Sequence, residues 1–399
     1  MSSNKLEGIQ ILRGYAAMLV VVTHLWSVGV ISSVLKFSRI GGLGVDIFFV
    51  ISGFIMCYSL RDRISSSDSV EFLKKRIFRV YPIYLLVLTP FLIHYLNQVA
   101  SPVDTPMIIG NLLLSPSFWD GSEYRMLVGP AWTLTYELFF YMLFAAAMFS
   151  SRTKDRAIYT VVMMIVLMVT LVNLLGLKGE RLQWSNFQYM VGDTLLFNFV
   201  IGCLCYFVWR KYGHAVFSFW TALGSALVLT VISLGLSKFG IPRVLSLGLP
   251  AGTIVLVFLF AEFENRNLTR PLLFLGSASY SIYLVHAVIA HWRHLIVGAS
   301  AHESDLTGVL LTGVALVAGC IFYLIVENPL SRVLHARARR SLPAAVPLRE
   351  SRPNSESKVV GRNAATLRLI ARVADRERSR QVRLRECCGA SHAKIRSAG

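Results

Sequence analysis

Residues 9–32 read IQILRGYAAMLVVVTHLWSVGVIS, an apolar stretch that contains Arg13 and His24. About 20 predominantly apolar residues cross the hydrocarbon core of a bilayer as a helix. This stretch is therefore predicted to be the first of about ten membrane-spanning helices. The other predicted spans are 43–60, 82–98, 131–150, 157–176, 187–209, 216–236, 244–262, 272–296 and 307–328.

The composition of the chain also indicates a membrane protein. Of the 399 residues, 55% are hydrophobic and only 16% are charged, and the mean hydropathy is +0.58. Soluble domains carry about 25% charged residues. We therefore expect an all-α polytopic membrane protein and exclude a soluble globular enzyme.

The positive charge is concentrated near one end of the chain. The formal net charge is +18, and residues 330–399 hold 17 of the 40 Lys and Arg but only 5 of the 22 Asp and Glu. This division predicts a transmembrane domain over 1–332 and a basic, largely disordered tail over 333–399. It also argues against a general nucleic-acid binder, so no nucleic-acid partner is expected. Within the tail, 364–386 has the pattern of a basic helix that binds anionic lipid, or it has no such role.

The distribution of Lys and Arg between the predicted loops gives the orientation. An excess lies on one side of the membrane if the N-terminus is cytoplasmic, and an even number of spans places the basic tail on that side too. Both termini are therefore predicted to be cytoplasmic. The short apolar run 107–114 is predicted to be an interfacial or re-entrant piece. No Cys or His spacing suggests a metal site, so no metal is expected.

Five ionisable side chains fall inside predicted spans. They are His24, Asp46, Glu137, Asp193 and His286. Such residues are costly in lipid and usually mark a transport pathway or a catalytic site. With a rise of about 1.5 Å per residue, all five are expected in the outer half of the bilayer.

Arg13 and His24 are eleven residues apart, which places them within roughly 20° on one helix face and about 16 Å apart along the axis. One face would then offer an anion anchor at the cytoplasmic mouth and a proton acceptor deeper in the membrane. The alternative is an arginine that only sets topology beside an unrelated core histidine.

Arg76 and Arg79 are three residues apart and share a helix face. With Lys74 and Lys75 they form a cytoplasmic cation cluster suited to phosphates, which arginine binds through paired hydrogen bonds. The alternative is again a role in topology alone.

Glu137 lies among aromatic residues in PAWTLTYELFFY, residues 130–141. A carboxylate in this setting needs a partner, either a histidine or a sugar hydroxyl. Trp132 and Tyr136 would suit stacking against a sugar ring. The alternative is a structural buried acid.

Ser279, Tyr283 and His286 are spaced three or four residues apart in SYSIYLVH, residues 279–286. This spacing places them on one helix face. They are expected either to act directly in a functional site or to form a row of hydrogen-bonded side chains with a structural role.

These segments together resemble the membrane-bound acyltransferase-3 family, and the opening segment is most similar to its exopolysaccharide-acetylating branch. The resemblance covers most of residues 8–332. It rests on several separated motifs in order, namely 9–24 with its arginine and histidine, GVDIFFVISGF at 44–54, RIFRVYP at 76–82, WTLTYELFFY at 132–141, YSIYLVH at 280–286 and VENP at 326–329.

The resemblance implies O-acylation of a sugar, usually with acetyl-CoA as the donor and without a tightly bound cofactor. It implies that His24 is the catalytic histidine and that Glu137 supports it or binds the acceptor. Three residues would hold the donor's phosphates, namely Arg13, Arg76 and Arg79. The residues expected to support the site or bind the acceptor are Asp46, Trp132, Tyr136, Asp193, Tyr283 and His286.

The expected setting is the bacterial inner membrane, with a lipid-linked saccharide or a polysaccharide as acceptor. Many members of the family carry an extracytoplasmic esterase-like domain after the membrane body. None is expected here, because the predicted tail is short, basic and cytoplasmic, so transfer to a distant polymer would need a polysaccharide-assembly protein. His24 would act as a general base or would carry the acyl group itself. The leading alternative is a proton-coupled saccharide transporter or flippase, because membrane-embedded acids and histidines also suit proton relays. A non-catalytic partner in an assembly complex is the third possibility.

Overall fold

The computed structural model describes residues 6–98, 104–118, 124–181, 186–213, 216–263, 266–298 and 304–333. The predicted basic tail lies outside these residues, apart from its first residue. Most of the described chain is helical. The α-helices are α1 (Glu7–Leu25), α2 (Val30–Leu35), α3 (Phe37–Ser59), α4 (Ser66–Gln98), α5 (Thr105–Leu113), α6 (Trp132–Ser150), α7 (Lys154–Leu174), α8 (Phe187–Val191), α9 (Phe197–Tyr212), α10 (Phe219–Leu236), α11 (Leu249–Leu259), α12 (Arg266–His291), α13 (His294–Val297) and α14 (Asp305–Phe322).

Shorter elements connect these helices. The 3-10 turns are η2 (Gly129–Ala131), η3 (Thr194–Leu196) and η4 (Ser237–Phe239), and the π-helical turns are η5 (Val244–Gly248) and η6 (Tyr323–Glu327). Two two-residue strands, β1 (Phe217–Ser218) and β2 (Ala261–Glu262), pair in parallel.

Within the described ranges, nine helices are long and apolar enough to cross a membrane. They overlap nine of the ten predicted spans. The predicted span 187–209 is not one helix, because α8 ends at Val191 and the chain continues through Asp193 into η3 and α9. The predicted span 244–262 corresponds to a shorter apolar helix, Val244–Leu259, in which η5 runs directly into α11. The architecture is that of a polytopic α-helical membrane protein.

The first predicted span, 9–32, ends earlier than expected. Helix α1 stops at Leu25, one residue after His24, and the chain then turns at Gly29, whose φ of +128° favours glycine. The short helix α2 follows. His24 therefore lies in the last turn of α1 and not in the middle of a helix.

Two neighbouring segments also differ from a simple series of spans. Helix α4 begins at Ser66, so Arg76 and Arg79 lie on the helix itself and not in a loop before it. The run 107–114, predicted to be an interfacial or re-entrant piece, lies largely in α5, a nine-residue helix. Asn111 of α5 is buried and accepts a hydrogen bond from the Leu127 N–H at 2.8 Å, which holds the returning chain against this helix.

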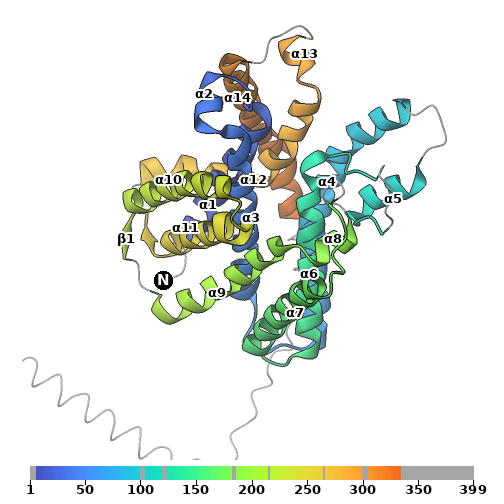
Figure 1. The fold of residues 1–399 in the computed structure, drawn as a ribbon, viewed down its shortest axis with the longest axis vertical. Helices are drawn as coiled ribbons and strands as arrows, with labels where there is room; N and C mark the ends of the chain where they lie inside the picture. Colours follow the sequence, from blue (N-terminus) through green and yellow to red (C-terminus); the bar gives the residue numbers. More distant parts are fainter. Residues whose placement is uncertain are drawn as a thin grey trace, which may run out of the picture. The chain divides into compact units, whose positions relative to one another are not determined.

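Helices α1, α3 and α12 lie at the centre of the molecule, with α4 and α6 to their right and α10 and α11 to their left in Figure 1. Glycines allow the central backbones to approach closely. A Cβ on Gly276 of α12 would lie 1.8 Å from the carbonyl oxygen of Gln10 in α1, and a Cβ on Gly202 of α9 would lie 2.1 Å from the carbonyl oxygen of Val50 in α3. These contacts hold the α1 residues Arg13 and His24 against their neighbours.

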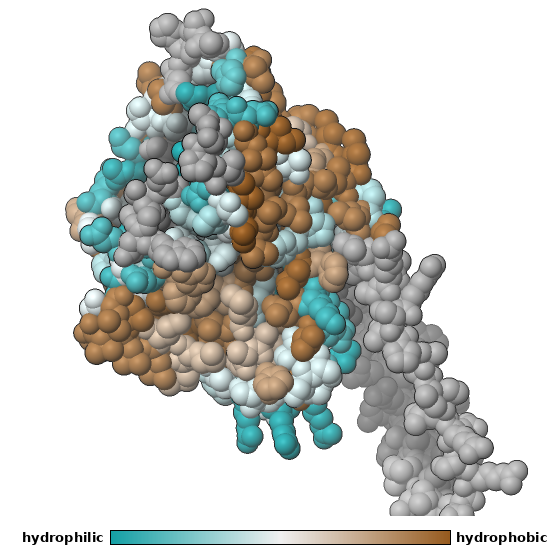
Figure 2. Space-filling view, turned by 90° about the vertical axis from the view of Figure 1, so that its right-hand side faces the viewer, coloured by the Kyte–Doolittle hydropathy of each residue, from teal (hydrophilic) through white to brown (hydrophobic). Residues whose placement is uncertain are grey.

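The peripheral helices keep large apolar side chains exposed. On α7 these include Tyr159, Met163, Leu167 and Leu171, which are four residues apart and share one helix face. Figure 2 shows wide brown apolar areas on one side of the molecule and hydrophilic side chains that project at the lower end. Apolar surface of this extent is suited to contact with lipid.

Candidate active site

A cavity of about 190 Å³ lies among α1, α3, α4, α6 and α12. Its wall carries three arginines, with Arg13 contributed by α1 and both Arg76 and Arg79 by α4. Much of the remaining wall is apolar and includes Val45 and Phe48 of α3. The cavity therefore combines a cationic region with an apolar one.

The three arginines differ in exposure and in their contacts. Arg79 is exposed, whereas Arg13 and Arg76 are partly buried. The Arg76 guanidinium lies over the Phe72 and Tyr141 rings, 5.4 and 5.9 Å from their centroids. Arg13 and Arg79 repel each other electrostatically, and within the described residues neither forms an ion pair. Three cations that line one cavity favour the binding of an anion there.

Glu137 lies in the same cavity, on α6. Its carboxylate accepts a hydrogen bond from Ser52 Oγ at 3.0 Å and another from the Tyr141 hydroxyl. It also interacts electrostatically with Arg13 and Arg76. Glu137 therefore belongs with the arginines, and no hydrogen bond between described residues joins it to a histidine.

A second acid, Glu327, completes the surroundings of these arginines. It stands at the end of the π-turn η6 and accepts a hydrogen bond from Ser281 Oγ of α12. It interacts electrostatically with Arg13 and Arg79. π-Helical turns are frequent at functional sites, and this one lies in the VENP motif, whose acid the sequence analysis did not assign to the site.

His24 and His286 form a pair on α1 and α12, with ring centroids 5.1 Å apart. His286 is fully buried, whereas His24 is exposed. The Nδ1 atom of His24 lies 2.8 Å from the carbonyl oxygen of Val20. A carbonyl only accepts, so Nδ1 must carry the proton, and Nε2 of the neutral ring keeps a free lone pair.

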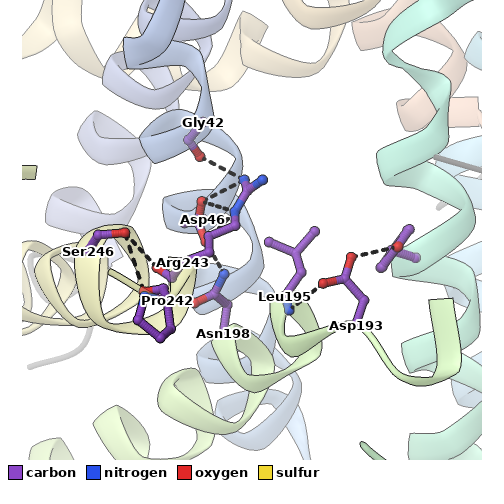
Figure 3. A network of polar contacts seen from close by, with 9 residues as sticks. Gly42, Asp46, Asp193, Leu195, Asn198, Pro242, Arg243 and Ser246 are labelled. Atoms are coloured by element: carbon purple, nitrogen blue, oxygen red, sulfur yellow. Dashed lines mark hydrogen bonds and ion pairs between the residues drawn. The ribbon is translucent and has the colours of Figure 1, made fainter. Parts of the chain in front are cut away.

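Asp46 is held in a buried ion pair, which Figure 3 shows. Arg243, which directly precedes η5, donates to the Asp46 carboxylate through Nη2 at 2.8 Å and Nε at 3.2 Å. Asn198 of α9 donates to the other carboxylate oxygen. Asp46 is fully buried. This carboxylate is therefore engaged by two partners from elements distant in the sequence.

Asp193 has a separate partner. The Tyr136 hydroxyl donates to its Oδ2 at 2.8 Å, and its Oδ1 accepts from the Leu195 N–H at 3.0 Å, which caps η3. The Trp132 ring packs edge-on against Tyr136, with centroids 5.6 Å apart. The cavity wall does not include Asp193, Tyr136 or Trp132.

The structure thus divides the five predicted ionisable residues among separate groups and does not gather them into one acid/base cluster. Glu137 lies with the arginines in the cavity, His24 pairs with His286, and the two aspartates have their own partners. The prediction that Arg13, Arg76 and Arg79 converge is supported by the shared cavity. Tyr283 lies between the groups, because it lines the cavity and its ring centroid is 5.7 Å from that of His286.

The sequence analysis missed four partners in these contacts, namely Arg243, Asn198, Ser52 and Glu327. Arg243 lies between the predicted spans 216–236 and 244–262. Its position after Pro242 and before an apolar run was a signal, because an arginine at a helix start inside the bilayer needs a counter-ion. No local sequence pattern identifies Asn198 or Ser52 as a partner.

No group of three or more His, Cys, Asp or Glu side chains in the described ranges is placed to hold a metal ion. The described cysteines, Cys57, Cys203, Cys205 and Cys320, are free thiols.

Comparison with known proteins identifies the family of the chain. Residues 6–326 match the acyltransferase-3 family model, described as an acyltransferase domain. The chain is 31% identical to the exopolysaccharide production protein ExoZ of Rhizobium meliloti, over 75% of this chain and 92% of that protein. It is 23% identical to the acyltransferase MdmB of Streptomyces mycarofaciens, over 84% and 93% of the two chains.

A further relative is the O-acetyltransferase OatA of Staphylococcus aureus, which is 24% identical over 83% of this chain and 58% of that protein. No solved structure gives a significant match. The family model spans every helix that contributes to the arginine-lined cavity and to the histidine pair. The chain therefore belongs to the acyltransferase-3 family and is a multi-pass membrane O-acyltransferase.

Proposed function

We propose that the protein transfers an acetyl group from acetyl-CoA to a hydroxyl of a lipid-linked or cell-surface saccharide. The observation that carries this proposal is the convergence of Arg13, Arg76 and Arg79 on one membrane-embedded cavity, with His24 further along the same helix as Arg13. Acetyl-CoA has phosphates at one end and a thioester at the other, so it fits a site with cations and a base at separate places.

The donor's phosphates would bind at the arginines. Arg79 is exposed and Arg13 is partly buried, so the three cations lead from the surface into the cavity. Arginine suits phosphate because its planar guanidinium makes paired, charge-assisted hydrogen bonds. Arg13 and His24 are about 16 Å apart along α1, a separation that the extended pantetheine arm bridges. The apolar wall at Val45 and Phe48 suits that arm.

His24 would supply the base. Its Nδ1–H is bound to the Val20 carbonyl, so Nε2 takes the proton of the acceptor hydroxyl. The hydroxyl oxygen then forms an ester bond with the acetyl carbon, the C–S bond breaks, and the proton goes to the departing thiolate. In the alternative route Nε2 attacks the thioester first, coenzyme A leaves as the thiol, and the acceptor hydroxyl then displaces the histidine.

The acceptor would reach His24 from the side opposite the cavity. His24 is exposed and does not line the cavity, whereas its partner His286 is buried behind it. A donor entering from the arginines and an acceptor approaching the exposed face of His24 would therefore meet from two sides. The printed name of the relative ExoZ refers to exopolysaccharide production, which favours a saccharide acceptor.

The proposed location is the bacterial inner membrane, with both termini in the cytoplasm, where acetyl-CoA is made. The excess of Lys and Arg in the loops assigned to that side supports this orientation. An acceptor carried on a lipid reaches the membrane by itself, while a finished polymer would require a polysaccharide-assembly partner.

Transfer and transport can be separated in one reconstituted system. Purified protein in lipid vesicles is given labelled acetyl-CoA and the saccharide fraction of producing cells, and ester formation is followed by NMR and thiol release. We expect wild type and His294→Ala, an exposed histidine on α13, to form the ester and His24→Ala to lose it at least about 100-fold. Saccharide movement across the vesicle without a new ester, or full activity of a folded His24→Ala variant, would contradict the proposal.

A further inference from the structure

Tyr283 lies in the part of the cavity wall that is next to the histidine pair. The Tyr283 side chain lines the cavity, and its ring contacts His286 with centroids 5.7 Å apart. His286 in turn lies 5.1 Å from His24, and neither histidine contributes to the cavity wall. An acyl group delivered through this cavity therefore meets Tyr283 before it reaches His24.

Tyr283 is fixed by contacts on several sides. Its hydroxyl lies 2.8 Å from Thr133 Oγ1 and 3.0 Å from the carbonyl oxygen of Pro130, and Thr133 Oγ1 also lies 3.1 Å from that carbonyl. These three groups satisfy one another, since each hydroxyl can donate one hydrogen and accept another. The ring also packs edge-on against Phe48 at 5.7 Å, and the residue is 5% exposed. Tyr283 is therefore a held wall and not a freely rotating side chain.

Ser279 lies one turn before Tyr283 on α12 and also lines the cavity. It is fully buried, and its Oγ has no hydrogen-bond partner among the described residues. An unpaired buried hydroxyl is costly, so a ligand oxygen that accepts its hydrogen would bind favourably there. A thioester carbonyl is such an oxygen.

We infer that Ser279 and Tyr283 form the acyl subsite of the donor cavity, an inference that rests on the proposed transfer from acyl-CoA. Ser279 Oγ–H donates to the thioester carbonyl, and Tyr283 limits the length of the acyl chain beyond it. Phe48 and Thr133 hold the Tyr283 ring in that position. A two-carbon group passes beside the ring toward the histidine pair, and longer chains collide with the ring. Tyr283 is thus the residue that determines acyl-chain specificity.

The test measures initial transfer rates from acetyl-, propionyl- and butyryl-CoA with the purified full-length protein. We expect Tyr283→Ala to raise the ratio of butyryl to acetyl transfer at least about 10-fold, because one or two methylenes in an apolar pocket change discrimination by about that factor. Ser279→Ala should lower transfer from all three donors by about 100-fold and leave the ratio unchanged, as expected for loss of a donor to the reacting carbonyl.

Tyr280→Phe is the matched control. Tyr280 lines the same cavity, but its hydroxyl donates to the carbonyl of Val80 at 2.8 Å and not to the wall beside Phe48. The ratio of butyryl to acetyl transfer by Tyr280→Phe should equal that of wild type. If Tyr283→Ala does not fold, Tyr283→Leu shortens the same side chain and should change the ratio in the same direction.

Two results would overturn the inference and are distinguishable. A Tyr283 variant that is stabilised by coenzyme A and keeps the wild-type chain-length ratio excludes Tyr283 as the limit, while leaving the proposed transferase intact. A wild-type protein that is folded and transfers nothing from any of the three donors removes the proposed function itself, and the acyl subsite with it.

Discussion

Arg243 and Asp46 are 197 residues apart in the sequence, yet the guanidinium Nη2 of Arg243 lies 2.8 Å from Oδ2 of Asp46. The carboxylate is fully buried, and about a quarter of the arginine side chain is exposed. This pair ties the start of η5 to α3, one of the helices that form the donor cavity. It therefore couples the short apolar helix Val244–Leu259 to the centre of the protein.

Loss of one partner of this pair should destabilise the protein strongly. Arg243→Met leaves Asp46 buried without its counter-ion, and such losses cost about 3–5 kcal/mol. The double variant Arg243→Met with Asp46→Leu should recover much of this stability, because no buried charge is left unpaired. Thermal unfolding of the purified protein in detergent measures both effects.

An exposed ion pair serves as the control for that experiment. Arg210 and Asp155 are 2.6 Å apart, and both side chains are nearly half exposed. Arg210→Met should change stability by no more than about 1 kcal/mol. Equal effects of the Arg210 and Arg243 substitutions would show that burial of the Asp46 pair contributes nothing.

Most of the helices could be predicted from sequence, because a membrane span requires a long apolar run that a hydropathy pattern detects directly. The helix ends could not be predicted in the same way. Helix α1 stops at Leu25 because the chain turns at Gly29, although apolar residues continue beyond it. Helix α4 starts well before its apolar stretch, because polar residues extend a helix outside the lipid without penalty.

Removal of the exposed arginine should weaken donor binding more than it slows the chemical step. Arg79→Ala deletes a charge-assisted contact of about 1.5–3 kcal/mol, so KM for acetyl-CoA should rise about 10- to 100-fold with kcat little changed. Lys74→Ala is the control, because Lys74 is an exposed cation on the same helix that does not line the cavity. If both variants raise KM equally, the arginine acts only through general surface charge. Steady-state kinetics over a range of acetyl-CoA concentrations give KM and kcat of both variants and so distinguish the two outcomes.

Asp305 should affect catalysis through the position of His24. Its carboxylate accepts hydrogen bonds from the Trp26 indole at 2.8 Å and from the Ile31 N–H at 3.0 Å, so it fixes the segment that directly follows His24. Asp305→Ala should lower kcat several-fold with KM for acetyl-CoA unchanged, because the donor cavity is not disturbed. Asp305→Asn keeps one acceptor oxygen and should restore part of the rate.

Ser304→Ala is the matched control for the Asp305 variants, because Ser304 caps α14 through Thr307 and does not contact the segment after His24. It should leave kcat near the wild-type value. A shift of KM in Asp305→Ala without any change in kcat would contradict the positioning role.

The close contact of α3 and α9 should tolerate no side chain at Gly202. A Cβ there would lie 2.1 Å from the Val50 carbonyl oxygen, so Gly202→Ala must push the helices apart, at a cost of at least about 2 kcal/mol. Gly224→Ala on α10 meets open space and should be neutral or stabilising by up to about 1 kcal/mol, since alanine favours helix. Thermal unfolding of the two variants side by side provides the measurement. Identical thermal unfolding midpoints for Gly202→Ala and Gly224→Ala would show that α3 and α9 do not pack this closely.

Relationships between site residues on one helix could be predicted from the sequence, whereas contacts between site residues on different helices could not. The eleven-residue spacing of Arg13 and His24 follows from helix geometry alone. The pairing of His24 with His286 depends on how α1 packs against α12, and local sequence contains no information on that packing. The same holds for Asp46, whose partner Arg243 comes from another part of the chain.

The position of Tyr283 also bears on the electrical insulation of the membrane. A water-filled passage from the arginine-lined cavity to the exposed His24 would let protons leak inward at every turnover, and each charge that crosses dissipates about 2.3 kcal/mol per 100 mV. The buried Tyr283 ring and the adjoining Phe48 line that route and narrow it. An acetyl group is neutral, whereas the phosphates of its carrier are not. In the proposed reaction only the neutral acetyl group thus crosses the membrane. The charged coenzyme A stays on the cytoplasmic side, and the membrane potential is not dissipated.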